Sequence, residues 1–362
     1  VVIVGAGPVG GRAATLLAER GIRVLMLQEH GEVRRPFQCA GLVTPSAMDA
    51  VGGHHTVLEE VDGALIHGPS GTLVPVGTDG VLRTYVVCRK RFDQYVVQQG
   101  MEAGAIVWLN SKPVDVTEQP QGVTVTVDKN GEQRQVSARL IIGADGAHSW
   151  TRRHFRMGRP KELMIGYQVE VTGYEGRDRW LEMYSGEEIA PGFFAWVIPS
   201  GFGTYRIGLW STAERLNGRS IRSCYQDLIQ HPLWADRFSK ISPVAEFCGP
   251  IPSGMVKMPV RDRVMLIGDA AGMAKPTTGG GLGPGFHQIQ CVIDPLVQAI
   301  QTNELTAKHL RSITKKPWEA MRKEQDRARA LRNLLVSDCI DSKLDSHFKN
   351  FAHPDTLSLI NT

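Results

Sequence analysis

The sequence opens with Val1-Val2-Ile3-Val4-Gly5-Ala6-Gly7-Pro8-Val9-Gly10, in which a run of four apolar residues leads directly into closely spaced glycines. Short β-branched apolar runs are typical of strands that are buried on both faces. A stretch rich in alanine and leucine follows at 12–20, and a second apolar run covers 23–27. The order of strand, glycine turn, helix and strand predicts a βαβ unit and therefore an α/β fold.

The glycines Gly5, Gly7 and Gly10 have the G-x-G-x-x-G spacing of a dinucleotide-binding turn. In such a turn the first glycine permits the sharp bend, the second lets a pyrophosphate approach the backbone, and the third allows close packing of the helix. The N-terminal amides of the helix then face the phosphates. We therefore predict a dinucleotide site here, with Val9 as a further contact. A glycine-rich βα turn without a ligand is the alternative.

The residue that binds the ribose hydroxyls normally ends the second strand, about 20 residues further on, and is normally acidic. In this register the chain has Gln28. A glutamine can donate to and accept from a hydroxyl, although it brings no charge. Glu29 is the alternative, but neighbouring residues of a strand point to opposite sides. We therefore favour Gln28.

Two further strand ends carry an aspartate beside a glycine. The apolar run at 140–142 leads to Asp145-Gly146, and the run at 264–267 leads to Gly268-Asp269. Each alone is a common strand end. Together with Arg89-Lys90-Arg91-Phe92-Asp93 at the start of an expected helix, they resemble the three fingerprints of the glutathione-reductase-type flavoproteins related to p-hydroxybenzoate hydroxylase. The resemblance implies that the dinucleotide is FAD.

The glycine loop at 279–281 precedes a helix that is expected to run to about residue 300. The N-terminal amides of such a helix can stabilise negative charge on a reduced flavin. A glycine loop without a ligand is the alternative. The resemblance implies FAD contacts from Asp269 to the ribityl and pyrophosphate region, from the Gly281 and Leu282 amides to the flavin ring, from Arg89 to the phosphates or ribityl chain, and from the Val114 backbone to the adenine.

Within this superfamily the chain resembles the geranylgeranyl reductase family, especially the archaeal digeranylgeranylglycerophospholipid reductases. The resemblance covers nearly the whole chain and rests on Pro36-Phe37-Gln38-Cys39-Ala40-Gly41-Leu42, on the aromatic segment at 191–199, and on Lys275-Pro276-Thr277-Thr278-Gly279-Gly280-Gly281. In the aromatic segment, Ile198 stands where the family usually has phenylalanine. The shape of the substrate cavity is therefore an open question.

The resemblance implies that the strand carrying Phe194 and Trp196 faces the flavin and lines an apolar tunnel for an isoprenoid chain. Because these residues are two apart, they should share one face of a sheet. It also places Cys39 over the isoalloxazine as a catalytic candidate, with Ala40 and Leu42 as further FAD contacts. For the aromatic residues and for the cysteine, an ordinary place in the core is the alternative.

The implied function is an FAD-dependent reductase of lipid biosynthesis that saturates isolated C=C bonds of geranylgeranyl chains, with archaeal-type ether-lipid precursors as expected substrates. An isolated alkene has no carbonyl to delocalise a carbanion, so a proton must accompany the hydride. Cys39 or a bound water is the candidate proton source. No second G-x-G-x-x-G follows a strand. We therefore expect electrons from a transient NAD(P)H or from a ferredoxin-like donor.

Two other kinds of flavoprotein remain alternatives. A flavin monooxygenase or halogenase shares the FAD fingerprints but acts on aromatic rings, and the Cys39 loop and the aromatic segment favour reduction. An electron-relay flavoprotein would be expected to have an iron–sulfur partner domain, which the cysteine spacing does not provide.

The domain organisation is expected to be discontinuous. A Rossmann-like FAD-binding domain would take residues 1–60, 89–157 and 263–301. The aromatic-rich, alternating segment at 158–262, together with short strands at 61–88, predicts an antiparallel-sheet substrate domain. The remaining residues, 302–362, are expected to be helical. Since the chain starts inside its first strand, we also expect residues to precede Val1.

Composition narrows the classes of partner. With 41 basic and 37 acidic residues, the net charge of +4 is too small and dispersed for a nucleic-acid site. Six cysteines without a C-x-x-C pair or zinc-like spacing predict reduced thiols, no metal site and a cytoplasmic location. No run of 18 apolar residues occurs. Peripheral contact with the cytoplasmic membrane is expected through amphipathic C-terminal helices, with packing on the protein as the alternative; their apolar residues are Leu331, Leu334, Leu335, Ile340, Leu344 and Phe348.

Overall fold

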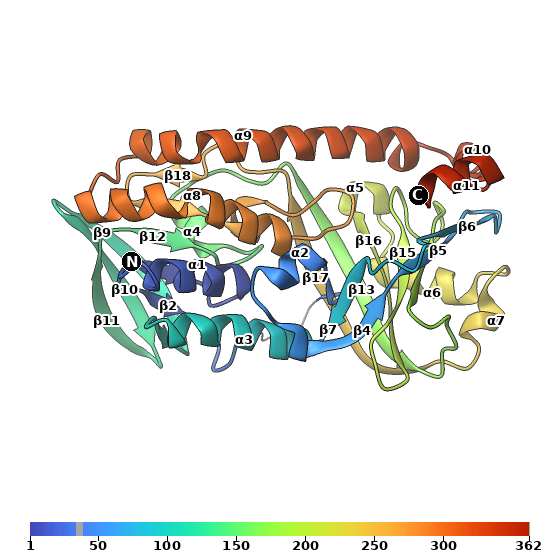
Figure 1. The fold of residues 1–362 in the computed structure, drawn as a ribbon, viewed down its shortest axis with the longest axis horizontal. Helices are drawn as coiled ribbons and strands as arrows, with labels where there is room; N and C mark the ends of the chain where they lie inside the picture. Colours follow the sequence, from blue (N-terminus) through green and yellow to red (C-terminus); the bar gives the residue numbers. More distant parts are fainter. Residues whose placement is uncertain (34–38, 362) are drawn as a thin grey trace.

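A computed structural model describes residues 1–33 and 39–361, so Pro36, Phe37 and Gln38 of the predicted loop motif lie outside the described residues. Figure 1 shows an elongated molecule with the N-terminal α/β unit at one end and a large sheet at the other. Two long helices run along one side of the molecule, above the α/β unit. The mixed α/β class predicted from the sequence is confirmed.

The α/β unit is built on a six-stranded sheet whose central strands are parallel and fully buried. Apolar runs without alternation form such strands because helices cover both faces. The order is β18 (Val260–Arg261), β19 (Val264–Leu266), β12 (Ile141–Gly143), β1 (Val2–Val4), β2 (Leu25–Leu27) and β8 (Ile106–Trp108), and β18 is antiparallel to β19.

Three helices pack together beside this sheet: α1 (Pro8–Ala18), α3 (Arg89–Glu102) and α8 (Leu282–Thr302). Small residues let α1 and α3 approach closely. A Cβ on Gly11 would lie 3.0 Å from the carbonyl oxygen of Val96, and one on Gly100 would lie 3.2 Å from the Ala14 methyl. The predicted βαβ unit and the helix predicted to start at Arg89 are therefore present.

A three-stranded meander extends from the α/β unit and consists of β9 (Ser111–Gln119), β10 (Gly122–Lys129) and β11 (Glu132–Ala138). The sequence predicts a hairpin here, with arms at 122–127 and 135–142 and a turn at Asn130-Gly131. That turn is the second one of the meander, with φ of 54° and 85°. The predicted second arm of this hairpin was too long. It was expected to reach Ile142, but β11 ends at Ala138, because the buried residues 141–143 instead form a central strand of the six-stranded sheet.

The second large sheet has seven strands in the order β17 (Ser242–Ser253), β13 (Glu162–Thr172), β16 (Thr204–Thr212), β15 (Ala195–Pro199), β14 (Trp180–Tyr184), β5 (Gly63–His67) and β6 (Leu73–Val76). Neighbouring strands are antiparallel except β14 and β5, which are parallel, so the expectation of a wholly antiparallel sheet is wrong at this pair. A smaller sheet lies alongside and contains β3 (Leu42–Val43), β7 (Thr84–Val87) and β4 (Val57–Val61), with α2 (Pro45–Asp49) and the 3-10 helix η1 (His54–Thr56) between β3 and β4.

Residues 213–238 were expected to continue the strands, but they form α5 (Ala213–Leu216), α6 (Ile221–Gln230) and α7 (Ala235–Phe238). Ser220 caps α6 by accepting a hydrogen bond from the Ser223 amide. Ile221, Cys224 and Leu228 recur at helical spacing and are buried against the seven-stranded sheet. The aromatic residues of this region favoured strands, so the helical spacing of these three apolar residues was not recognised from the sequence.

The C-terminal part is helical, as predicted. It contains α9 (Ala307–Arg332), a π-helical turn η3 (Asn333–Ser337), α10 (Asp341–Phe351) and α11 (Pro354–Ile360). In Figure 1, α8 and α9 run side by side. Among the described residues, none of the helices combines the length and the hydropathy needed to cross a bilayer.

Candidate functional site

The glycine turn after β1 has two crowded positions and one open position. A Cβ on Gly5 would lie 2.5 Å from the Ala144 carbonyl oxygen, and one on Gly10 would lie 2.2 Å from the Gly5 carbonyl oxygen. A Cβ on Gly7 would meet no atom of the described residues within 4 Å. Gly7 is the N-cap of α1, and no described side chain caps that end. The turn therefore presents open backbone at a helix N-terminus, which fits a phosphate.

The aspartate of the second strand end has a structural role. Asp145 accepts hydrogen bonds from the Ser149 hydroxyl at 2.6 Å and from the Thr151 amide and hydroxyl at 2.8 and 2.9 Å. It thereby supports α4 (Trp150–His154). Burial raises the pKa of Asp145, and these hydrogen bonds oppose that shift. Arg152 in α4 donates to the carbonyls of Ala147 and Ala270, so it joins this loop to the third fingerprint.

The third fingerprint brings Asp269 next to the N-terminus of α8. Asp269 lies in the 3-10 helix η2 (Gly268–Ala271), and a Cβ on Gly281 would lie 2.7 Å from its Oδ1. Gly281 is the N-cap of α8, directly before Leu282, and as a glycine it brings no side chain of its own to cap the helix. Val9, in the first fingerprint, packs against the third fingerprint and α8. A Cβ on Gly268 would lie 3.3 Å from the Val9 side chain, and a Cβ on Gly285 would lie 2.6 Å from it.

An open glycine, two helix N-termini that begin at glycines and a half-buried carboxylate thus meet in one region. Backbone amides suit the pyrophosphate and the reduced flavin ring, and the carboxylate suits hydroxyl groups. The residues present therefore fit a flavin dinucleotide.

The two predicted contacts of the adenosine half lie on different sheets: Gln28 follows β2 of the six-stranded sheet, and Val114 lies on β9 of the meander. Gln28 donates from Nε2 to the Glu32 carbonyl oxygen at 3.2 Å. Val114 is the extra residue of a β-bulge, since Pro113 lies opposite Val127 and Asp115 opposite Thr126. A bulge frees backbone groups from the regular ladder, so this geometry suits the predicted adenine contact. Glu29 is exposed and lines a hollow of about 350 Å³.

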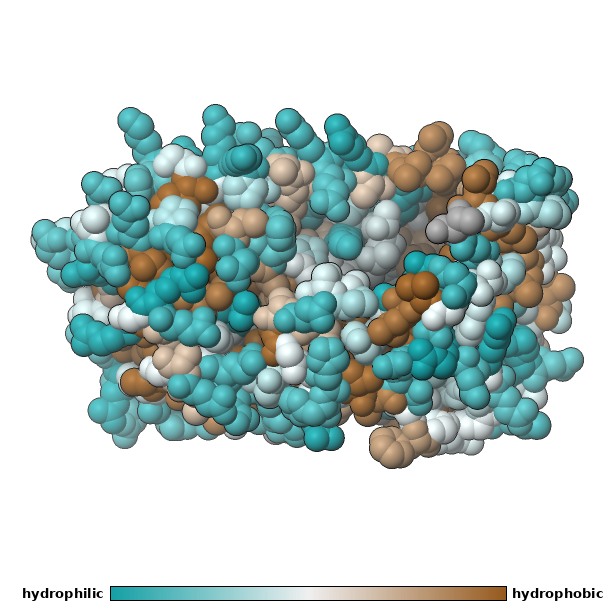
Figure 2. All heavy atoms as spheres, viewed as in Figure 1, coloured by the Kyte–Doolittle hydropathy of each residue, from teal (hydrophilic) through white to brown (hydrophobic). Residues whose placement is uncertain are grey.

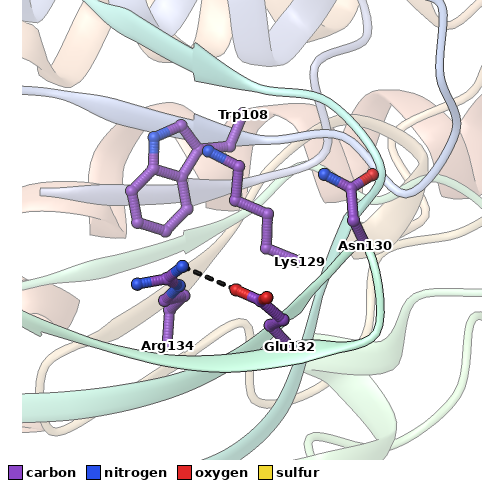
Figure 3. Close-up of a pocket in the computed structure, with 5 residues that line it drawn as sticks. All are labelled: Trp108, Lys129, Asn130, Glu132 and Arg134. Atoms are coloured by element: carbon purple, nitrogen blue, oxygen red, sulfur yellow. Dashed lines mark hydrogen bonds and ion pairs between the residues drawn. The ribbon is translucent and has the colours of Figure 1, made fainter.

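A neighbouring hollow of about 410 Å³ belongs to the meander (Figure 3). The Lys129 ammonium lies 4.4 Å from the centre of the Trp108 ring, and Glu132 pairs with Arg134 at 2.6 Å. These charges already satisfy one another, and the hollow is open to solvent. We therefore place the chemistry elsewhere.

The predicted substrate strand presents an aromatic surface. Phe194 and Trp196 have ring centroids 6.4 Å apart, and Phe194 is 5.4 Å from Trp210. Ala195 and Val197 point to the opposite face, into the core under α6 and α7. The aromatic surface meets the glycine loop of the third fingerprint, because a Cβ on Gly279 would lie 3.0 Å from the Trp210 ring. The aromatic face and the α8 N-terminus are therefore adjacent.

The sulfur of Cys39 lies against a buried guanidinium. Arg89 Nη1 donates to Cys39 Sγ at 2.7 Å, and the Gly41 amide donates to the same sulfur at 3.4 Å. Arg89 also binds both carboxylate oxygens of Asp93, at 2.9 and 3.1 Å. Sequence reasoning assigned Arg89 to FAD, and among the described residues its side chain contacts Asp93 and Cys39.

Two buried polar residues that the sequence analysis missed hold the same loop. Gln168 on β13 donates to the Cys39 carbonyl oxygen at 3.3 Å and accepts from the Trp196 indole at 3.2 Å. Arg206 on β16 donates to the Ala40 carbonyl oxygen at 2.9 Å. Their only sequence signal is a polar side chain at an inward position of a strand. Leu42, the last predicted contact of this loop, is half-exposed in β3 and pairs with Val86 of β7.

Comparison with known proteins identifies the family. Residues 1–302 match the family model described as FAD binding domain. Digeranylgeranylglycerophospholipid reductase 2 of Methanopyrus kandleri is 30% identical over 335 residues, which are 88% of this chain and 82% of that protein. The chain belongs to the digeranylgeranylglycerophospholipid reductase family. Reductase 1 of Methanothermobacter thermautotrophicus is similar as well, with 29% identity over 96% of this chain and 88% of that protein.

The fold is shared more widely than the family. A geranylgeranyl bacteriochlorophyll reductase-like structure from Thermoplasma acidophilum superposes with a TM-score of 0.90 at 23% identity, over 99% of this chain and 94% of that one. A halogenase in complex with FAD gives 0.77 at 15% identity, over all of this chain and 84% of that one. The predicted cofactor, FAD, and the predicted class, an oxidoreductase, are confirmed for this member of the reductase family.

Proposed function

We propose that this protein saturates isolated C=C bonds of geranylgeranyl chains on archaeal-type ether-lipid precursors. The observation that carries the proposal is the aromatic face of the half-buried Phe194 and Trp196, which pack on the buried Trp210 directly beside the glycine loop at 279–281. An apolar, uncharged surface suits a hydrocarbon chain. The kinship with reductases of digeranylgeranylglycerophospholipids supports this class of substrate.

Bound FAD, once reduced, supplies a hydride. The chain's own residues have three tasks around it. Phe194 and Trp196 orient the alkene and exclude water, which would otherwise compete for charge and protons. Cys39 holds a proton at Sγ for the carbon that does not receive the hydride. Gln168 fixes the distance between these two parts, because it is bonded to the Trp196 indole and to the Cys39 backbone.

The first prediction tests this function directly. The purified holoenzyme is reduced with dithionite under anaerobic conditions and mixed with a digeranylgeranylglyceryl phospholipid, and the lipids are analysed by mass spectrometry. We expect products that have gained two hydrogen atoms for each saturated bond. Cys39→Ser should slow the reaction by about a hundredfold or more, the usual range for losing a general acid. Cys248→Ser, which changes an exposed cysteine on β17, should leave the rate unchanged.

Reoxidation of the flavin by oxygen alone, together with a hydroxylated or halogenated aromatic product, would instead assign the protein to the monooxygenases or halogenases that share its fold. The same anaerobic assay identifies the electron donor when dithionite is replaced by NADH, NADPH or a reduced ferredoxin-like protein. We propose that one of these supplies the electrons from outside the chain.

We also propose a cytoplasmic location with peripheral contact to the cytoplasmic membrane. Two of the six residues of the predicted apolar stripe pack on the protein: Leu344 and Phe348 are buried against Val74 of β6. Leu331, Leu334 and Ile340, in contrast, are 55, 62 and 72% exposed. Figure 2 shows apolar surface over the end of α9 and the start of α10. Exposed leucines beside basic residues are typical of surfaces that bind anionic lipid headgroups.

This apolar surface lies close to the substrate site. Arg332, the residue after Leu331, is buried. Its guanidinium donates to the Pro276 carbonyl oxygen at 2.8 Å and lies 4.6 Å from the centre of the Phe193 ring. Ser337 donates to the Gly192 carbonyl oxygen at 2.5 Å. The end of α9 therefore rests on the aromatic segment and on the FAD loop, so a lipid surface here would bring the isoprenoid chain to the site.

The second prediction concerns this surface. We expect the double variant Leu331→Ser, Leu334→Ser to bind vesicles of phosphatidylglycerol at least tenfold more weakly in flotation assays, since burying each leucine contributes about 1.5–3 kcal/mol. Leu233→Ser, at a leucine of similar exposure before α7, is the matched control and should bind like the wild type. Equal binding by the double variant would place membrane contact elsewhere.

A further inference from the structure

Arg89 is fixed in place by a carboxylate on its own helix. It lies in the first turn of α3 and is only 5% exposed. Its Nε and Nη2 form a two-pronged pair with Asp93, one turn later. A planar guanidinium held by two parallel hydrogen bonds cannot swing away. Its remaining edge, at Nη1, is therefore aimed at a defined point.

That point is the sulfur of Cys39, at 2.7 Å. The Gly41 amide reaches the same sulfur from the loop itself, at 3.4 Å. Both groups donate, so both favour a sulfur that carries negative charge. Burial opposes the charge of Arg89, but Asp93 and Cys39 more than compensate, so that the pKa of Arg89 lies above its ordinary value.

The charged groups around Cys39 come from three elements. Besides Arg89 and Asp93 on α3, Arg206 on β16 is bonded to the Ala40 carbonyl oxygen, and Glu170 on β13 and Cys88 lie within electrostatic range of Arg206. Asp93 occupies the edge of the Arg89 guanidinium formed by Nε and Nη2, leaving Nη1 for the sulfur. Among the described residues, the Arg89 cation and the Gly41 amide both donate directly to the sulfur.

We propose that Arg89, aligned by Asp93, is a positioning residue that makes Cys39 ionise near neutral pH. A cysteine ordinarily ionises at about pH 8.5, and a neighbouring guanidinium lowers that value. The inference rests on the proposed function for its catalytic meaning. An acid is most effective when it ionises near the working pH, because it then releases and recovers its proton readily.

The proton balance is simple. The S–H bond of Cys39 breaks, the proton joins one carbon of the alkene, and the other carbon takes the hydride that reduced FAD supplies. The electron pair of the S–H bond remains on sulfur as a thiolate, paired with Arg89. Water returns the proton before the next bond is reduced. Arg89 itself keeps its protons throughout, since a guanidinium does not deprotonate in proteins.

The third prediction measures this ionisation without requiring turnover. Purified holoenzyme is treated with iodoacetamide across a pH series, and the alkylation rate of each cysteine is read from its peptide by mass spectrometry. We expect the midpoint for Cys39 to lie at least one pH unit below that of the same peptide in denatured protein. Cys248 on β17 is the internal control. The residue as a whole is exposed, but its thiol is partly desolvated, which raises the pKa of Cys248, so its midpoint should be higher.

Variants separate the charge of Arg89 from its structural role. Arg89→Gln should raise the Cys39 midpoint by at least one pH unit, and Arg89→Lys should restore part of the effect. Asp93→Asn should raise it by less than Arg89→Gln, because the cation remains but is less well aligned. The ultraviolet absorbance of the thiolate, taken as the difference between wild type and Cys39→Ser, gives the same midpoint without a reagent.

A Cys39 midpoint that is equal in wild type, Arg89→Gln and denatured protein would overturn the inference. Its failure is distinguishable from failure of the proposed function. If the midpoint shifts as expected but Cys39→Ser still reduces the alkene at the wild-type rate, then Arg89 controls the thiol and the catalytic role of Cys39 is wrong.

Discussion

Gly7→Ala should fold like the wild type and yet fail to hold FAD. The Gly7 backbone has φ of −86°, which alanine adopts freely, and a methyl group there would meet no described atom within 4 Å. The stability of the apoprotein should therefore change by no more than about 0.5–1 kcal/mol. The methyl would, however, occupy the space through which the pyrophosphate reaches the α1 amides. Losing two charge-assisted hydrogen bonds, about 1.5–3 kcal/mol each, should raise the Kd for FAD by a hundredfold or more.

Gly10→Ala is the matched contrast, because its methyl would lie 2.2 Å from the Gly5 carbonyl oxygen. Backbone must move to relieve that overlap, so this variant should lower the melting temperature of the apoprotein as well as FAD affinity. Thermal melting of apoprotein and titration with FAD, monitored by flavin fluorescence, check both variants. If Gly7→Ala lost stability but kept its FAD affinity, the open side of the turn would not be the cofactor site.

The sequence predicted the elements whose chemistry is local. The run from Val1 to Gly10 contains its own strand, turn and helix start; Gly5 has the positive φ of the sharp bend, Gly7 has open space and Gly10 lies close to the Gly5 carbonyl. Asn130-Gly131 likewise determined its hairpin turn. Such features depend on neighbouring residues, so they can be read without knowledge of the rest of the fold.

The errors arose where distant segments decide the outcome. The pairing of β14 with β5 joins residues more than a hundred positions apart, and no local pattern specifies that it is parallel. Helix α6 was not predicted from the sequence, because its apolar residues pack in the same core as the aromatic strands and were interpreted as part of them. In both cases, tertiary contacts outweighed the local signal.

The candidate site shows the same limit. Cys39, Phe194 and Trp196 could be selected because they belong to motifs. Gln168 and Arg206 could not, because each is a single polar residue in an ordinary strand and acquires its role only when the loop at 39–41 folds against it. Arg89 was selected as an FAD contact from the motif at the start of its helix, but its contact with Cys39, 50 positions earlier in the chain, could not be predicted from that motif.

Glu182→Ala should be among the most destabilising single changes in the seven-stranded sheet. Glu182 is 1% exposed and accepts hydrogen bonds from the Tyr174 hydroxyl at 2.8 Å, the Tyr184 hydroxyl at 2.5 Å and Arg237 at 2.6 Å. It lies opposite Val197 on β15, on the face away from Trp196. Its removal would strand a partly buried guanidinium and two buried hydroxyls. We expect a loss of about 3–5 kcal/mol in the free energy of unfolding, measured with urea on the holoenzyme.

Glu175→Ala is the control, because Glu175 forms an exposed ion pair with Lys240 near the same sheet. Its loss should cost no more than about 1 kcal/mol. A similar cost for the two variants would mean that the Glu182 cluster does not support the sheet.

The stabilisation by Glu182 should also depend on pH in a defined direction. Burial acts to raise the pKa of Glu182, but the His67 imidazole 3.7 Å away, the hydrogen bond from Tyr184 and the charge of Arg237 outweigh it, so that the net pKa is lowered. A carboxylate with a lowered folded pKa stabilises the protein above the unfolded value of about 4.3, and this contribution is lost as the pH falls through the folded pKa. The advantage of wild type over Glu182→Gln should therefore persist from neutral pH down to about pH 5 and shrink only below about pH 4. If the difference in free energy of unfolding between wild type and Glu182→Gln disappeared between pH 7 and 5, burial would have a larger effect on the Glu182 pKa than its hydrogen-bonding and charged neighbours. The carboxylate would then be protonated in the folded sheet.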